Sequence, residues 1–179
     1  MQKRLDVYLS ENNTVKSRSL AASLIKQGSV EVNGRICTKA SFAVDENDNI
    51  RIIGEMPKYV GRGGLKLEKA LSHYRLHLDG SVCIDIGAST GGFTDCMLQN
   101  GAVKVYSVDV GTDQLDEKLR NDPRVVSMEK TDIRNCVGTL PEVDFIGIDV
   151  SFISLKLVLP SAYALLKDGG ECVALIKPQ

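Results

Sequence analysis

The spacing of hydrophobic positions in the first 55 residues predicts two short helices and a small sheet. Leu5 to Leu9 favours a first helix, and apolar residues from Leu20 to Ile25 recur at the period of a second. Ser17 before that run and Gly28 after it are typical helix-capping residues. Alternation over residues 30–32 then leads into Asn-Gly, the strongest short hairpin signal, and isoleucines at 50, 52 and 53 indicate a later strand. This segment is expected to be a small α+β module.

A different pattern follows, in which short apolar runs alternate with helical spacing. Strands are predicted over residues 82–86, 103–110, 125–128, 143–150 and 171–176. Helices are predicted around residues 67–74, 93–99 and 155–166, and Pro160 inside the last one predicts a break or a late start. Alternating strands and helices favour an α/β fold, a doubly wound parallel sheet. The expected organisation is a module over residues 1–55, a glycine-rich linker over 56–64 and a larger domain over 65–179.

Charge and cysteine content narrow the classes of protein. The 179 residues carry a net charge of −1, yet residues 1–44 hold seven basic and three acidic residues and are net +4. This asymmetry favours binding of a polyanion by the first module, although a solvated basic face would look the same. The five cysteines show neither disulfide nor zinc spacing, and no apolar run approaches the length of a membrane span. A cytoplasmic protein without a metal site and without a membrane partner is expected.

A glycine-rich loop follows the first strand of the larger domain. In Asp85-Ile-Gly-Ala-Ser-Thr-Gly-Gly92 the spacing of the glycines matches neither a dinucleotide fingerprint nor a triphosphate loop. Asp109 ends the second strand, 22 residues after Gly87, at the distance expected for a carboxylate that binds ribose hydroxyls. The combination favours S-adenosylmethionine as the cofactor, and a glycine turn in a non-binding protein is the alternative. The candidate cofactor-binding residues of the loop and the second strand are Asp85, Gly87, Ala88, Ser89, Thr90, Gly91, Gly92 and Asp109.

Isolated charges end two later strands of the predicted sheet. Asp149 follows the fourth strand and Lys177 follows the fifth, so both should face the same crevice as the glycine loop. A lysine beside a carboxylate in such a cleft can act on a hydroxyl nucleophile, and Lys66 could add a second cation. Each charge taken alone could simply meet solvent.

Ordered motifs along the whole chain resemble a known family. Arg4-Leu-Asp6, Ser17-Arg18 and Gly28-Ser-Val-Glu-Val-Asn-Gly34 resemble the RNA-binding module of ribosomal protein S-four. The runs Tyr59 to Lys66, Asp85 to Asp95, Val105 to Asp109, Asp149 to Ser154 and Lys177 to Gln179 are similar to the TlyA (haemolysin A) family of ribosomal RNA 2′-O-methyltransferases.

The resemblance implies a Rossmann-like (FtsJ-like) methyltransferase domain that modifies the ribose of cytidine in ribosomal RNA or a ribosomal subunit. Three members of the family's Lys-Asp-Lys-Glu catalytic set fall on Lys66, Asp149 and Lys177, and the glutamate would lie beyond Gln179. Asp132 would approach the adenine of the cofactor or, alternatively, cap a turn. The residues expected to bind RNA phosphates are Arg4, Lys16, Arg18, Lys26, Arg35, Lys39 and Arg62.

Two other functions remain open at this point. The chain ends directly after its fifth strand, which would leave an apolar edge unpaired and suggests truncation. A non-catalytic RNA-binding or ribosome-assembly protein is therefore an alternative. Membrane lysis, which the older family name invites, has little support because no long apolar or basic amphipathic helix is present. The sequence leaves the modified nucleotide open.

Overall fold

The computed structural model describes residues 2–12, 14–15, 17–54 and 57–177. Contacts between residues divide the chain into two compact units, Met1–Met56 and Pro57–Gln179. Residues 57–64, expected to be a linker, thus belong to the second unit. Helix α3 already begins at Gly63, and the Tyr59 side chain is buried in the core of this unit.

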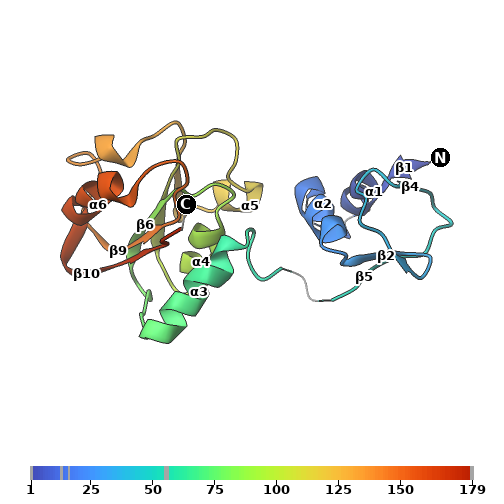
Figure 1. The fold of residues 1–179 in the computed structure, drawn as a ribbon, viewed down its shortest axis with the longest axis horizontal. Helices are drawn as coiled ribbons and strands as arrows, with labels where there is room; N and C mark the ends of the chain where they lie inside the picture. Colours follow the sequence, from blue (N-terminus) through green and yellow to red (C-terminus); the bar gives the residue numbers. More distant parts are fainter. Residues whose placement is uncertain (1, 13, 16, 55–56, 178–179) are drawn as a thin grey trace. The chain divides into compact units, whose positions relative to one another are not determined.

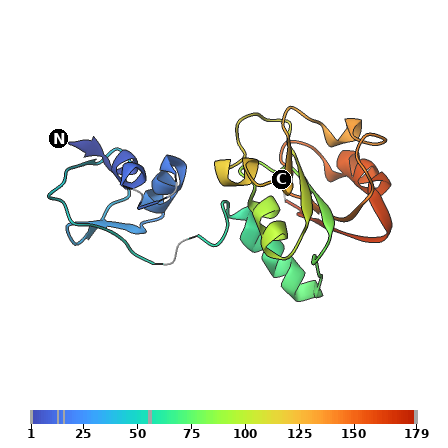
Figure 2. The same cartoon turned by 180° about the vertical axis from the view of Figure 1, so that it is seen from behind.

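In its described residues, the first unit (blue to cyan in Figures 1 and 2) contains two helices and two small sheets. Strand β1 (Lys3–Arg4) pairs with β4 (Ala43–Val44), and β2 (Val30–Val32) lies between β3 (Arg35–Ile36) and β5 (Ile50–Ile52). Helices α1 (Leu5–Glu11) and α2 (Arg18–Lys26) pack together over a core that includes Leu5, Leu24 and Val30. The sequence-based helices and hairpin are confirmed. The α2 cap is also confirmed, because the Ser17 side chain accepts a hydrogen bond from the Leu20 amide.

The second unit is built on a five-stranded parallel sheet in the order β10-β9-β6-β7-β8. The strands are β6 (Val82–Ile86), β7 (Lys104–Val108), β8 (Val125–Met128), β9 (Val143–Ile148) and β10 (Leu166–Ala174). The remaining elements are α3 (Gly63–Tyr74), α4 (Gly92–Gln99), α5 (Glu117–Arg120), the 3-10 helix η1 (Ile133–Asn135) and α6 (Leu155–Ala164). The α/β prediction is confirmed.

Two apolar layers cover the two faces of this sheet. Alternate residues of β6 point to opposite sides, so that Cys83 joins the layer beneath α3 and α4 while Ile84 joins the layer beneath α6 and η1. Figure 1 shows α3 and α4 on one side of the strands and α6 on the other. The strand order reverses between β6 and β9, and this is the switch point at which doubly wound sheets bind ligands.

Two predicted elements differ from the structure. Helix α6 continues unbroken through Pro160. Proline has no amide hydrogen, so the Lys156 carbonyl loses its helical hydrogen bond. Because Pro160 and Lys156 both lie on the exposed face of the helix, water can bind to that carbonyl instead. Val158 and Ala162 anchor the opposite, buried face. Strand β10 begins at Leu166, five residues before the predicted start, and its register shifts before Glu171. None of the described helices has the length and hydropathy required to cross a bilayer.

Candidate active site

The glycine loop and the residues after β9 meet at the carboxyl ends of the strands. The Gly87 amide donates to the Val108 carbonyl, and the Asp149 amide donates to the Ile86 carbonyl, so both segments are fixed to neighbouring strands. Gly87 has a φ of +85°, and a Cβ there would lie 2.8 Å from the Asp149 carbonyl oxygen. Glycine is required at this position both by the backbone conformation and by the close approach.

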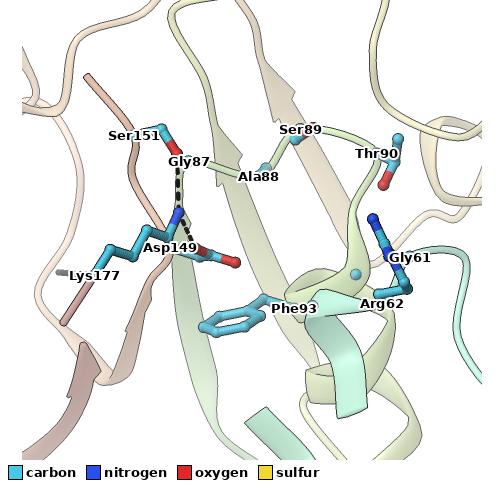
Figure 3. Close-up of a pocket in the computed structure, with 12 residues that line it drawn as sticks. Gly61, Arg62, Gly87, Ala88, Ser89, Thr90, Phe93, Asp149, Ser151 and Lys177 are labelled. Carbon is cyan, nitrogen blue, oxygen red and sulfur yellow. Dashed lines mark hydrogen bonds and ion pairs between the residues drawn. The ribbon is translucent and has the colours of Figure 1, made fainter. Parts of the chain in front are cut away.

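Lys66, Asp149 and Lys177 are brought together as the sequence predicted. The Lys177 Nζ lies 2.5 Å from Asp149 Oδ1 and donates to Ser151 Oγ at 2.9 Å, whereas Lys66 Nζ lies 3.7 Å from Asp149 Oδ2. Figure 3 shows the Lys177 side chain reaching across to Asp149 and Ser151. The Asp149 side chain is mostly buried, and both lysines remain partly exposed. The cluster thus places one lysine on each side of the Asp149 carboxylate.

A first cavity of about 210 Å³ opens beside this cluster. Its walls come from the glycine loop, from the start of α3 and from the strand ends (Figure 3), namely Gly61, Arg62, Gly63, Gly87, Ala88, Ser89, Thr90, Gly92, Phe93, Asp149, Ser151 and Lys177. Sequence reasoning placed Gly61 and Gly63 in a linker and gave Ser151 no role. The run of glycines before Lys66 was the sequence signal that could have placed this segment at the site. Glycines permit the close backbone contact that the structure shows between Gly61 and Gly92.

A second cavity of about 380 Å³ adjoins the first and shares the walls formed by Gly87, Ser89, Asp149 and Ser151. Asp109 lines it, and the Asp109 carboxylate accepts hydrogen bonds from the amides of Ser89 (2.8 Å) and Gly111 (2.7 Å). Each carboxylate oxygen can accept a second bond, so Asp109 can still bind ribose hydroxyls.

Asp132 also lines the second cavity, but it has structural partners of its own. Its carboxylate caps η1 through the Arg134 amide and pairs with the Arg134 guanidinium, which lowers the pKa of Asp132. The turn-capping alternative considered from the sequence is therefore present in the structure.

Asp85 and Gly91 line neither cavity. Asp85 is fully buried behind the loop, where Oδ2 accepts hydrogen bonds from the Thr94 amide (2.9 Å) and hydroxyl (2.7 Å). This contact ties β6 to the first turn of α4 and so shapes the loop between them. Burial, with smaller contributions from Asp149 and Asp109, raises the pKa of Asp85 to about 7. Gly91 packs against Leu115 and Leu119 instead.

A buried carboxylate fastens the segment before α3 to α4. Asp95 Oδ2 accepts a hydrogen bond from the Val60 amide at 2.9 Å, and Oδ1 accepts one from Lys118 Nζ at 3.1 Å. Gln99 bridges Asp95 Oδ1 and the Lys58 carbonyl. The chain just before Gly61 is therefore attached to the helix that begins in the glycine loop. The described residues contain no cluster of potential metal ligands.

The residues expected to bind RNA are mostly exposed on the first unit. Arg4, Arg18, Lys26, Arg35 and Lys39 are exposed there, and Lys16 lies outside the described residues. Arg62 is exposed on the second unit, where it lines the first cavity. Arg4 and Arg18 both pair with Asp6.

Comparisons with known proteins agree with this division of the chain. Residues 59–179 match the model of the FtsJ-like methyltransferase family, and residues 3–50 match that of the S4 domain. The chain is 46% identical to "Putative rRNA methyltransferase YqxC" of Bacillus subtilis, over 99% of its own length and 64% of the relative's. It is 40% identical to the "16S/23S rRNA (cytidine-2'-O)-methyltransferase TlyA" of Mycobacterium tuberculosis, over 98% of its own length and 67% of the relative's.

A solved structure shows a similar fold. "Putative hemolysin from Streptococcus thermophilus" superposes with a TM-score of 0.70 at 46% identity, covering 98% of this chain and 66% of the other. The chain thus spans about two thirds of the length of the proteins that it resembles.

Proposed function

Because the chain belongs to the FtsJ-like methyltransferase family and carries an S4 domain, we propose that it methylates the 2′-hydroxyl of cytidine in ribosomal RNA, with S-adenosylmethionine as the methyl donor. The observation that carries the proposal is the Lys66–Asp149–Lys177 cluster beside the glycine loop. A cytoplasmic location belongs to the same proposal, in keeping with the five free cysteines.

The larger cavity and the glycine loop beside it suit this cofactor. Gly87 and Ser89 of the glycine loop line the larger cavity, and Asp109 places carboxylate oxygens in it where ribose hydroxyls could donate to them. The Asp132 carboxylate lines the same cavity and could accept a hydrogen bond from an adenine amine, although its oxygens also bind Arg134. We assign the larger cavity to the adenosine part, which leaves the smaller one for the reacting ribose. The cofactor supplies an electrophilic methyl carbon.

The charged cluster would prepare the hydroxyl nucleophile. With the ribose in the smaller cavity, the charge of the Lys177 ammonium lowers the pKa of the hydroxyl, or the neutral amine, after it has released its own proton to solvent, takes up the hydroxyl proton. Asp149 orients the amine, and Ser151 holds it from the other side. Lys66 is a second cation near the same carboxylate, and its charge favours the alkoxide that develops as the proton leaves.

Replacement of Lys177 tests this assignment. In the protein as its gene encodes it, Lys177→Ala should reduce methyl incorporation into ribosomal RNA by at least about a hundredfold, the usual scale for loss of acid–base assistance. Affinity for S-adenosylmethionine, measured by calorimetry, should change little. Lys167→Ala is the matched control, because Lys167 lies on β10, the strand that precedes Lys177, and its amine pairs with Asp144 instead.

Two results would contradict the proposal. Unchanged turnover in Lys177→Ala would remove the role given to that lysine. Failure of the unaltered protein to bind S-adenosylmethionine, with RNA binding retained, would favour a non-catalytic RNA-binding protein.

On the RNA side, the S4 domain is the proposed anchor. Its exposed cations would contact phosphates, which fixes position without reading sequence. Arg62, at the first cavity, could reach the backbone near the reacting nucleotide.

A further inference from the structure

Asp6 is a buried carboxylate in the first unit, next to two of its basic residues. It lies in the first turn of α1 with 3% of its surface exposed, yet both of its nearest charged neighbours reach solvent. About half of the Arg4 side chain and more than half of the Arg18 side chain are exposed. A buried carboxylate between two exposed guanidinium groups requires an explanation, because burial of a charge is costly unless its partners are fixed.

The hydrogen bonds of Asp6 use all the usual acceptor positions of a carboxylate. Oδ1 accepts from Arg4 Nε at 2.9 Å and from the Val7 amide at 3.1 Å. Oδ2 accepts from Arg4 Nη2 at 3.0 Å and from Arg18 Nε at 2.9 Å. Arg4 thus binds as a two-pronged fork, and the hydrogen bonds and charges of Arg4 and Arg18 lower the pKa of Asp6 to about 2, so the carboxylate stays charged at neutral pH.

The same bonds leave donors on both arginines. Arg18 uses only Nε toward Asp6, so its two Nη groups remain, and Arg4 keeps Nη1. Within the described ranges, no other hydrogen bond from these two guanidinium groups is found. Arg4 comes from β1 and Arg18 from the start of α2, so a single carboxylate gathers two donors from separate elements. Planar groups with spare paired donors are suited to phosphate oxygens.

We propose that Arg4 and Arg18 form one phosphate-binding pair for RNA and that Asp6 is the positioning residue that holds both guanidinium groups in place. This inference rests on the proposed RNA-binding role of the first unit. Holding the side chains in advance reduces the conformational entropy lost when RNA binds. Asp6 therefore increases RNA affinity although its own charge repels phosphate.

The sign of one substitution distinguishes positioning from bulk charge. Asp6→Asn removes a negative charge and would strengthen RNA binding if only net charge mattered. Positioning predicts the opposite, because an asparagine has one acceptor oxygen and cannot hold the Arg4 fork and Arg18 together. Glu46→Gln is the matched control. It removes one exposed negative charge from the same unit, and its RNA affinity should be unchanged or slightly higher.

Binding of the chain to transcripts of 16S and 23S ribosomal RNA is the measurement, over a series of salt concentrations. We expect Asp6→Asn to weaken binding by about fivefold or more, since loss of a charge-assisted fork is worth roughly 1 kcal/mol. Circular dichroism checks that the first unit remains folded. Binding that becomes tighter in Asp6→Asn, as in Glu46→Gln, would overturn the positioning role.

A second pair of variants tests the phosphate-binding role of the arginines if Asp6→Asn does not fold. Arg18→Gln should lower the slope of log affinity against log salt by about 1, as loss of one phosphate contact predicts. Arg51→Gln removes another exposed arginine, from β5, and should leave the slope nearly unchanged. Equal slopes in these two variants would overturn the pair.

S-adenosylmethionine affinity, measured on the same samples, separates the possible failures. A chain that binds the cofactor but neither RNA transcript would refute the RNA-directed function together with this inference. Tight RNA binding that survives in Arg18→Gln and rises in Asp6→Asn would refute the arginine pair alone.

Discussion

Single buried residues determine how the glycine loop of this chain is held. Asp85 ties β6 to α4 through Thr94, and Oδ1 of Asp85 has no hydrogen-bond partner among the described residues. An ionised carboxylate in that position is poorly compensated, which is why the pKa of Asp85 rises to about 7. Asp85 therefore supports the loop at some cost to the stability of the fold at neutral pH.

The pH dependence of stability should reveal this cost. Because the Asp85 pKa is higher in the folded state than in the unfolded state, the folded chain binds more protons between about pH 4 and 7. The contribution of Asp85 to the free energy of unfolding should thus fall as pH rises through that range and level off above it. Asp85→Asn should flatten this part of the curve in urea unfolding of the second unit. A variant with the same slope as the unaltered chain would contradict the assignment.

Gly87 offers a second test at the residue scale. Gly87→Ala introduces both an unfavourable φ and a contact with the Asp149 carbonyl, whereas Gly138→Ala introduces only the unfavourable φ, of +82°, in open space. We expect Gly138→Ala to destabilise the chain by about 1 kcal/mol and Gly87→Ala by about 2–4 kcal/mol. Only Gly87→Ala should also weaken S-adenosylmethionine binding in calorimetry. Similar effects of both substitutions on stability and on binding would show that the close approach is unimportant.

Between elements, the contact of Asp95 with the segment before α3 is the feature that sequence reasoning could not supply. It joins residues 35 positions apart through a backbone amide, which carries no sequence signal of its own. The resulting attachment helps to position Gly61 and Gly63 at the wall of the first cavity.

Loss of this attachment should be visible in amide hydrogen exchange. In Asp95→Ala, the Val60 amide loses its acceptor and should exchange at least about tenfold faster, since a broken hydrogen bond to a charged group is worth more than 1 kcal/mol. The Val82 amide, which donates to Asp144, serves as an internal control and should keep its rate. Equal acceleration of both amides would indicate general destabilisation instead.

The sequence predicted the elements better than their boundaries. The apolar runs of β6 and β8 are bounded by polar or glycine residues, and their ends match the prediction. The predicted start of β10 does not match the structure. The sequence Asp168-Gly169-Gly170 is typical of a turn, whereas in the structure Leu166 already pairs with Val143. The strand-end charges were predictable as a cluster, since carboxyl ends of parallel strands share one edge. The helix α6 was predicted, but the break expected at Pro160 is absent, because the solvent exposure of Pro160 depends on packing.

For the molecule as a whole, two units with separate cores predict that the two proposed binding activities are separable. The first unit has its own apolar core around α1 and α2, and both cavities lie within the second unit. Within the first unit, the excess of basic residues is confined to residues 1–44, which are net +4.

Removal of the first unit should therefore affect one activity alone. A chain that starts at Pro57 is expected to retain S-adenosylmethionine binding within about twofold, since every residue that lines the cavities is present. Its affinity for ribosomal RNA should fall by at least about tenfold and become less sensitive to salt, because most phosphate contacts are lost. Undiminished RNA affinity would place the main RNA contacts on the second unit.

The wall shared by the two cavities has a consequence for inhibitor design. Gly87, Ser89, Asp149 and Ser151 border both spaces, so the two cavities are immediate neighbours. An adenosine analogue joined by a short tether to a second nucleoside would occupy both and lose its translational freedom only once. Such a bisubstrate compound should bind more tightly than either half. The tether length that gives the tightest binding would report the distance over which the methyl group is transferred.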